Sequence, residues 1–251
     1  MEPRLQPHLT SGARVDSSGS GLWRLTIPAG PAGRYRWAQL DDYDAIPRLR
    51  FPCRAPTRLE LLARVSANGL AGTWGFGFWN DPFSLGLGIG GAAARLPALP
   101  NAAWFFHASP PNYLALRDTH PAQGFLMGTF RSPLIPSAMF LPGLPGVPLL
   151  AWPPAARCLR RMAAGLIGED AARLALDCTS WHHYSLDWQK ETVTFGVDGQ
   201  VAFQTSCSPG GRLGLVIWID NQFAAFPPDG RLRSGTLPAA QESWLEIQFP
   251  E

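Results

Sequence analysis

Three titratable side chains are candidates for acid–base catalysis: His107, Asp81 and Asp118. His107 ends the aromatic segment 102–107, and an imidazole can accept or donate a proton near neutral pH. Alternation along a strand places His107 on the same face as Phe105, so it reaches a ligand only if that face lines a groove. The other interpretation is a hydrogen-bonded histidine at the end of a strand.

Each of the two carboxylic acids also has a structural alternative. Asp81 lies between Asn80 and Pro82, where it can contact a ligand, bind an ion or form a turn, and Asx before proline favours the turn. Asp118 directly follows Arg117, so it either borders a groove or pairs with the arginine at a strand end. No Asp or Glu occurs between Asp81 and Asp118, so strands in this interval carry no carboxylate.

Aromatic residues form the candidate binding surface. Segment 74–79 is aromatic at every position except its two glycines, which is typical of a central strand whose backbone is closely approached. Alternation sends about half of such rings into a core and leaves the others to stack on a ligand. The apolar segment 213–220 runs into Asn221, at a position that either binds a polar ligand or cation or forms a capped turn. The ligand-binding candidates are Trp74, Phe76, Trp79, Phe105, Tyr113, Trp218 and Asn221.

Metal-binding patterns are weak. Asp41-Asp42-Tyr43-Asp44 could hold calcium through carboxylate oxygens, but its spacing is not that of an EF-hand loop, and a solvated turn is the simpler interpretation. The adjacent histidines at 182 and 183 point to opposite faces of a strand, which argues against zinc. We therefore predict no metal site and no cofactor, with structural calcium at the acidic cluster left open.

An all-β fold would position these residues. Short apolar segments are separated by turn residues, with 26 Gly and 25 Pro in 251 residues, which favours sheets over a helix bundle. Asp198-Gly199, between two β-rich segments, predicts a tight hairpin. We expect residues 1–20 to be a flexible arm and residues 21–251 to form one antiparallel two-sheet jelly-roll sandwich.

One short helix is expected within this domain. Apolar residues recur at helical spacing from Leu159 to Ile167, after Pro153-Pro154 and before Gly168. The apolar segment 133–154 contains seven prolines, so we expect no regular strand or helix throughout it. A loop of this length is often functional, and it is either a lid over a groove or a contact between subunits.

Two stretches carry a resemblance to a known family. In segment 72–79 a glycine turn leads into a Trp/Phe-rich strand, and segment 182–188 has the pattern His-x-Tyr-x-x-x-Trp, followed by the Asp198-Gly199 hairpin. These features resemble the concanavalin A-like lectin and glucanase superfamily, and most of all its family-16 glycoside hydrolases. The resemblance implies a jelly-roll sandwich with a glucan-binding concave groove.

The sequence departs from this family at the catalytic strand. The family pattern there is Glu-x-Asp-x-(x)-Glu, whereas the corresponding stretch here is Ala103-Trp104-Phe105-Phe106-His107. Retaining hydrolysis needs two carboxyl groups about 5–5.5 Å apart, one as the acid and one as the nucleophile. We therefore predict that ordinary glycoside hydrolysis is absent.

Composition narrows the partners and the location. The formal net charge of +2 gives no global attraction for nucleic acid. We expect no membrane span, and the absence of an apolar signal region after the N-terminus predicts a cytoplasmic protein. Cys53, Cys158, Cys178 and Cys207 lack Cys-x-x-Cys spacing and are interpreted as reduced thiols, with a Cys158–Cys178 or Cys53–Cys207 disulfide left open.

Two main functional hypotheses follow. The first is a small-ligand binding protein, with carbohydrate as the leading class because of the family resemblance. The second is an enzyme acting on an apolar small molecule, such as a polyketide or isoprenoid, with His107, Asp81 or Asp118 as acid or base. A third is an interaction module that forms a homo-oligomer through the apolar loop 133–154.

Overall fold

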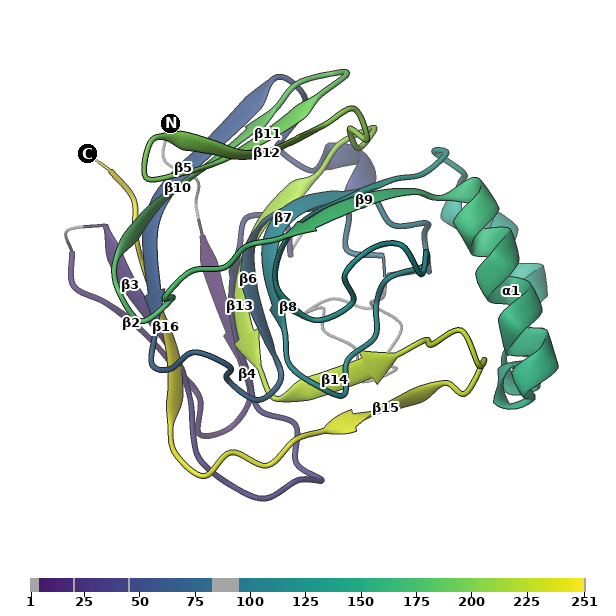
Figure 1. Cartoon of the computed structure of the whole chain (residues 1–251), viewed down its shortest axis with the longest axis horizontal. Helices are drawn as coiled ribbons and strands as arrows, with labels where there is room; N and C mark the ends of the chain where they lie inside the picture. The colour runs from purple at the N-terminus through teal and green to yellow at the C-terminus, as the bar shows by residue number, and fades with distance from the viewer. Residues whose placement is uncertain (1–4, 20, 45, 83–94, 251) are drawn as a thin grey trace.

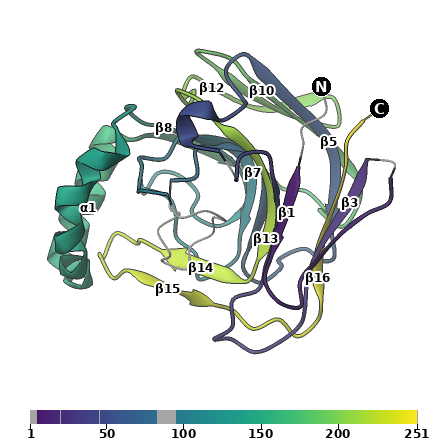
Figure 2. The same cartoon turned by 180° about the vertical axis from the view of Figure 1, so that it is seen from behind.

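Figure 1 shows the computed structural model, which describes residues 5–19, 21–44, 46–82 and 95–250. Within these residues the chain forms two seven-stranded antiparallel sheets and a separate two-stranded sheet. Figures 1 and 2 show the two large sheets as the layers of a sandwich, with one α-helix at the side of the molecule. The predicted all-β, two-sheet jelly-roll fold with one short helix is therefore confirmed.

Each large sheet combines strands from both ends and from the middle of the chain. Sheet A has the order β1 (Gln6–Leu9), β4 (Trp37–Asp41), β13 (Gly214–Asp220), β6 (Thr73–Trp79), β7 (Ala102–Ala108), β8 (Gly124–Arg131) and β9 (Gly168–Arg173). Sheet B has the order β12 (Gln200–Thr205), β11 (Val193–Val197), β10 (His182–Trp188), β5 (Thr57–Val65), β16 (Ser243–Gln248), β3 (Leu22–Ile27) and β2 (Arg14–Ser17). The small sheet pairs β14 (Gln222–Ala225) with β15 (Arg233–Thr236).

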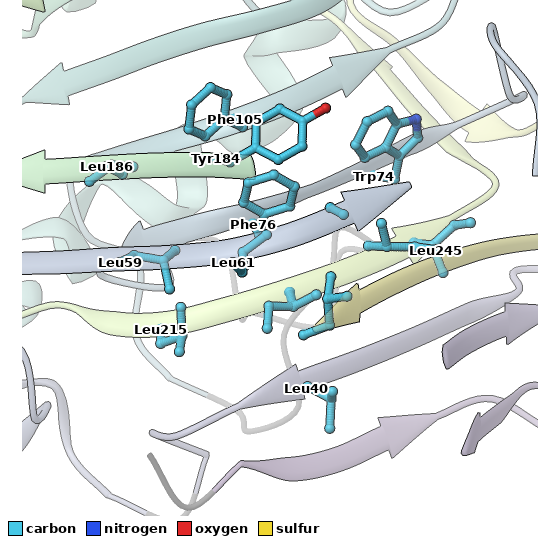
Figure 3. Packing of buried hydrophobic residues seen from close by; sticks show 14 of the residues in the cluster. Leu40, Leu59, Leu61, Trp74, Phe76, Phe105, Tyr184, Leu186, Leu215 and Leu245 are labelled. Atoms are coloured by element: carbon cyan, nitrogen blue, oxygen red, sulfur yellow. The ribbon is translucent and has the colours of Figure 1, made fainter. Parts of the chain in front are cut away.

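Period-two burial builds the core between the sheets. On β5 the side chains of Leu59, Leu61, Ala63 and Val65 are buried and those that alternate with them are more exposed, as a strand with one core face requires. Figure 3 shows rings from sheet A and Tyr184 of β10 meeting in this interior. The β11–β12 hairpin turns at Asp198-Gly199, as the sequence predicts.

The helical segments lie between β8 and β9. The helix α1 (Pro153–Leu166) confirms the predicted helix and begins at its two prolines. The preceding segment corrects the expectation of irregular structure, because η2 (Ser137–Ala151) is a 3₁₀-helix. The fixed φ of proline, about −65°, is compatible with 3₁₀ geometry, so prolines do not exclude it. A further 3₁₀ turn, η1, spans Arg48–Arg50. No helix in the described ranges is long and apolar enough to cross a membrane.

The N-terminal segment is not the flexible arm that its composition suggests. Strand β1 pairs with β4 at the edge of sheet A, and β2 pairs with β3 at the edge of sheet B. Edge pairing uses backbone hydrogen bonds, so it needs no apolar pattern in the added strand. Polar composition alone therefore gave the wrong expectation for residues 6–9 and 14–17.

Candidate functional site

The candidate site lies on the face of sheet A that is turned away from sheet B. Side chains of β4, β13, β6 and β7 that point this way, together with the start of β14, line a pocket of about 110 Å³, which we call the aromatic pocket. No Lys, Arg or His occurs among the described lining residues. The lining consists of Trp37, Gln39, Thr73, Trp79, Trp104, Phe106, Asn112, Leu114, Trp218, Asp220, Gln222, Phe223 and Ala224.

Two glycines of β6 make room for the floor of this pocket. In strand register Gly75 lies opposite Trp218, and Gly77 lies opposite Trp104. A Cβ at position 75 would come within 2.8 Å of the Trp218 ring, and one at position 77 within 2.6 Å of the Trp104 Cβ. Larger side chains would therefore displace the rings, which explains the alternation of glycine with aromatic residues in this strand.

The rings of the pocket pack on one another around Trp218. Its ring centroid lies 6.5 Å from that of Trp79, 5.8 Å from that of Phe106 and 5.6 Å from that of Trp104. Aromatic pairs in such offset or tilted geometries each contribute about 0.5–1.5 kcal/mol beyond the area that they bury. The floor is thus a preorganised aromatic platform.

Asp220 is the single carboxylic acid among the described lining residues, and it is buried. Its Oδ1 accepts hydrogen bonds from Thr73 N (3.2 Å), Thr73 Oγ1 (2.9 Å) and Gln222 N (3.0 Å). Burial raises the pKa of Asp220 to about 7, although these hydrogen bonds oppose the rise. Because Oδ1 already accepts these hydrogen bonds, the proton of the neutral carboxyl group is placed on Oδ2, from which it can be donated to a ligand.

Hydrogen bonds fix the polar edge of the platform. Trp218 Nε1 donates to Thr73 Oγ1 (2.9 Å), which couples this ring to Asp220. Trp79 Nε1 donates to the Tyr43 hydroxyl (2.6 Å). Gln39 Nε2 donates to the same hydroxyl at 3.2 Å. These bonds hold the donors of the two indoles, so the rings present their apolar faces.

A second acid is too far away to pair with Asp220. Asp41 is also buried in sheet A, but in register it lies opposite Val216, four positions along β13 from Asp220. At about 3.3 Å per residue, four positions correspond to about 13 Å. That separation exceeds the carboxyl distance of both retaining and inverting glycosidases, about 5–9.5 Å.

His107 lies on the other face of β7, which corrects the groove-facing position considered from the sequence. Its buried imidazole stacks on Trp74 with ring centroids 5.6 Å apart, and Nε2 lies 3.3 Å from the carbonyl oxygen of Leu70. Desolvation lowers the pKa of His107. The face that it shares with Phe105 packs against sheet B, so His107 has the position of a core histidine.

Three of the predicted ligand-binding rings belong to the same interior. Trp74, Phe76 and Phe105 are buried between the sheets, where Figure 3 shows them grouped near Tyr184. Phe76 and Phe105 have ring centroids 5.1 Å and 5.0 Å from that of Tyr184. Their placement corrects the expectation that they line a groove, because the sequence shows alternation but not which face is internal.

Asp81 and Asp118 lie apart from the aromatic pocket. Asp81 is fully buried just after β6, has a positive φ of 48°, and forms an ion pair with Arg95 (Oδ2 to Nη1, 2.6 Å). Asp118 is largely exposed and pairs with Arg160 of α1 (Oδ1 to Nη2, 2.8 Å). Neither is among the described residues that line the pocket. The three acid–base candidates are therefore not brought together, and both aspartates contact cations.

Tyr113 and Asn221 adjoin the pocket without being among its described lining residues. The Tyr113 ring lies under the Arg160 guanidinium, 5.7 Å from its Cζ. Asn221 is buried, accepts a hydrogen bond from Arg36 N (2.8 Å) and donates to the carbonyl oxygen of Leu237 (2.8 Å). Of the predicted ligand-binding residues, Trp79 and Trp218 are the two that line the pocket.

The acidic cluster forms a turn, but Asp41 is fully buried in it, which corrects the solvated turn that the sequence analysis gave as the simpler interpretation. Asp41 Oδ1 accepts hydrogen bonds from the backbone N of Tyr43 (3.1 Å) and Asp44 (2.9 Å), and Asp42 Oδ1 accepts one from Leu215 N (2.9 Å). Within the described ranges no group of three or more His, Cys, Asp or Glu side chains is placed to hold a metal ion. The four cysteines are free thiols.

Several pocket residues were not assigned to ligand binding from the sequence. Trp104 and Phe106 alternate with the core residue Phe105, and Asp220 lies two positions after Trp218 on the same face. The signal that could have selected them is the pair Gly75 and Gly77. A face with glycines on one strand has room for large rings on its neighbours, so the phase of the glycines marks the pocket side.

Comparison with known proteins gives similarity to solved structures alone. No family model matches the chain, and no curated protein does. A family-16 endo-glucanase from Bacteroides ovatus aligns with a TM-score of 0.48 and 10% identity, over 97% of this chain and 93% of that one. The laminarinase catalytic domain from Thermotoga maritima gives a TM-score of 0.41 and 11% identity, over 95% and 79%. An immunostimulatory antigen and pseudo β-1,3-glucanase of Mycobacterium tuberculosis gives a TM-score of 0.41 and 12% identity, over 95% and 79%.

Proposed function

We propose that the aromatic pocket binds one ring of a neutral carbohydrate and does not hydrolyse it. The observation that carries this proposal is the composition of the pocket: indole and phenyl rings surround neutral amides, a hydroxyl and one carboxyl group of near-neutral pKa. A sugar ring has apolar C–H faces that stack on aromatic rings and hydroxyl groups that need both donors and acceptors at its edge. A volume of about 110 Å³ suits one ring better than a chain of several.

The charge of the lining supports a neutral ligand. With no basic side chain among the described lining residues, an anionic ligand would be buried without a counter-charge, which is strongly unfavourable. A protonated Asp220 adds a neutral donor at the edge of the platform. Uronic acids and sugar phosphates should therefore bind much more weakly than neutral sugars.

The absence of hydrolysis rests on the missing partner for Asp220. The side chains of β7 that face the pocket are Trp104 and Phe106. The sequence resemblance aligns this strand with the one on which family-16 enzymes carry their acids. The distance of about 13 Å to Asp41, estimated from strand register, allows neither the covalent nor the water-mediated mechanism. Asp220 alone can orient a hydroxyl group but cannot complete either mechanism.

The test is a direct binding measurement with a panel of methyl glycosides of glucose, galactose, mannose, xylose and N-acetylglucosamine, followed by isothermal titration. We expect at least one member to bind, and Trp104→Ala to weaken that binding about tenfold, the equivalent of one lost aromatic contact. The matched control is Trp181→Ala, because Trp181 is a half-exposed tryptophan that precedes β10 of sheet B. Circular dichroism confirms that both variants fold.

Two outcomes would contradict the proposal. One is the absence of binding by every glycoside of the panel at millimolar concentration. The other is release of reducing sugar from laminarin or lichenan that is lost in Asp220→Asn, which would make the protein a hydrolase.

The raised pKa of Asp220 supports a second candidate, proton transfer to an apolar small molecule. The pocket is mostly aromatic, and a carboxyl group with a pKa of about 7 is suited to general acid catalysis at neutral pH. A thermal-shift screen with isoprenoid and polyketide compounds separates the candidates, because a ligand that binds the folded state raises the melting temperature. Stabilisation by such a compound, and not by glycosides, would favour the second candidate.

A further inference from the structure

Helix α1 turns its apolar side chains toward solvent and not toward the rest of the protein. Its apolar side chains Leu159, Met162 and Leu166 form one stripe at helical spacing, yet they are 41%, 65% and 47% exposed. A surface helix of a globular protein normally turns such a stripe toward the core. Figures 1 and 2 both show α1 at the outer edge of the molecule.

A buried arginine fixes this orientation. Arg160, on the opposite side of α1, is 8% exposed, and its Nε donates to the carbonyl oxygen of Phe226 (3.0 Å). Its Nη2 donates to the carbonyl oxygen of Ala115 (2.9 Å) and forms the ion pair with Asp118. Rotating α1 to bury the leucines would remove these bonds from a buried guanidinium, which is costly. The outward stripe is therefore an enforced feature of the native fold.

The surface beside α1 is also apolar. In η2 and the residue that links it to α1, Met139, Leu149 and Trp152 are 68%, 62% and 62% exposed. Single exposed apolar side chains are ordinary, but several on one helix and its neighbour indicate an interaction surface. Tryptophan at such a position is typical of the boundary between water and lipid.

The charges in this segment are of one sign. No Asp or Glu occurs from residue 119 to residue 168, and Arg157 and Arg161 are exposed on α1. The adjacent turn between β14 and β15 contributes one exposed acid, Asp229, together with Arg231. An apolar stripe on a helix that carries exposed arginines and no acid of its own matches an anionic lipid surface, to which each arginine adds about 1 kcal/mol.

We infer that α1 and η2 form a membrane-docking element, which places the protein on an anionic lipid surface with α1 lying in the interface plane. Leu159, Met162, Leu166 and Trp152 enter the boundary of the acyl chains, and Arg157 and Arg161 contact phosphate groups. A second copy of this chain fits less well. The α1 helix of a second copy carries no carboxylate that could pair with Arg157 and Arg161.

The experiment is co-sedimentation of the whole chain with lipid vesicles. We expect binding to phosphatidylcholine vesicles that contain roughly 30% phosphatidylglycerol, and at least tenfold weaker binding to phosphatidylcholine alone. The double variants Leu159→Gln/Met162→Gln and Arg157→Glu/Arg161→Glu should each reduce binding about tenfold or more. The matched controls Leu49→Gln and Arg34→Glu/Arg54→Glu change exposed residues outside this element and should bind as the native protein does.

Two results would overturn the inference. One is equal sedimentation with and without anionic vesicles. The other is a dimer in analytical ultracentrifugation that Leu159→Gln/Met162→Gln converts to a monomer, since a second copy would then cover the stripe. All substituted side chains are exposed, so loss of folding is not expected, and circular dichroism checks it.

Discussion

Asp220→Asn should change the pH dependence of stability of this protein. Burial raises the pKa of the carboxyl group from 3.8 to about 7, so the folded state holds a proton at pH values where the unfolded state has lost it. The stability contributed by the neutral form is complete below about pH 3.8 and is lost as the pH rises through about 7. At about 1.4 kcal/mol per pH unit, the loss amounts to about 4 kcal/mol.

Asparagine at this position separates charge from hydrogen bonding. Its Oδ1 can still accept the hydrogen bonds from Thr73 and Gln222, but the side chain cannot ionise. We expect the native protein and the variant to differ by about 1 kcal/mol or less at pH 4.5, the cost of one altered neutral hydrogen bond. At pH 8.5 the variant should be the more stable protein by about 3–4 kcal/mol.

Urea denaturation at a series of pH values from 4.5 to 8.5 measures this difference. The same experiment with Asp16→Asn is the control, because Asp16 is exposed. Burial also raises the pKa of Asp42, to about 6, but that group is present in both proteins and cancels in the comparison. If the stability curves of the native protein and Asp220→Asn run parallel across this range, Asp220 is not protonated in the folded state and the reasoning about its role fails.

Three further changes test how the pocket and core are built. Gly75→Ala should destabilise the fold by several kcal/mol in chemical denaturation and weaken glycoside binding, because its Cβ would meet the Trp218 ring at 2.8 Å. The control Gly165→Ala in α1 places a Cβ that meets nothing within 4 Å and should be neutral or slightly stabilising, so equal effects of the two substitutions would contradict the tight packing at Gly75. Arg95→Met should lower the free energy of unfolding by about 3–5 kcal/mol, because it removes the ion pair between Arg95 and the buried Asp81 carboxylate. Arg14→Met, in the exposed pair with Glu242, should lower it by about 0–1 kcal/mol. Similar losses in the two variants would show that Asp81 is not a buried charge. His107→Ala should lower the melting temperature while the remaining folded protein binds glycoside with native affinity. The contribution of His107 to the stability of the native protein, measured as the difference from His107→Ala, should fall as the pH drops below 6.5, because the lowered pKa of His107 leaves the unfolded state holding more protons. A loss of affinity without a loss of stability would return His107 to the site.

The sequence determined the class of fold and a good part of its local structure. Glycine and proline between short alternating segments require strands, the Asp198-Gly199 pair requires a hairpin, and Pro153-Pro154 before a helical repeat requires a helix start. These are local preferences of the backbone and do not depend on distant residues. The absence of any Asp or Glu from residue 82 to residue 117 is likewise a property of the sequence, and it removes acids from β7 in any arrangement.

For β7, the tertiary structure decided which face of the strand forms the pocket. Alternation divides β7 into a set with Phe105 and a set with Trp104, but both sets are aromatic, so neither pattern marks the interior. The choice depends on what sheet B presents, and it sends Phe105 and His107 inward. Asp220 shows the same limit. Its pKa depends on burial and on Thr73, 147 residues away in the chain, and such a contact exists only after the sheet has formed.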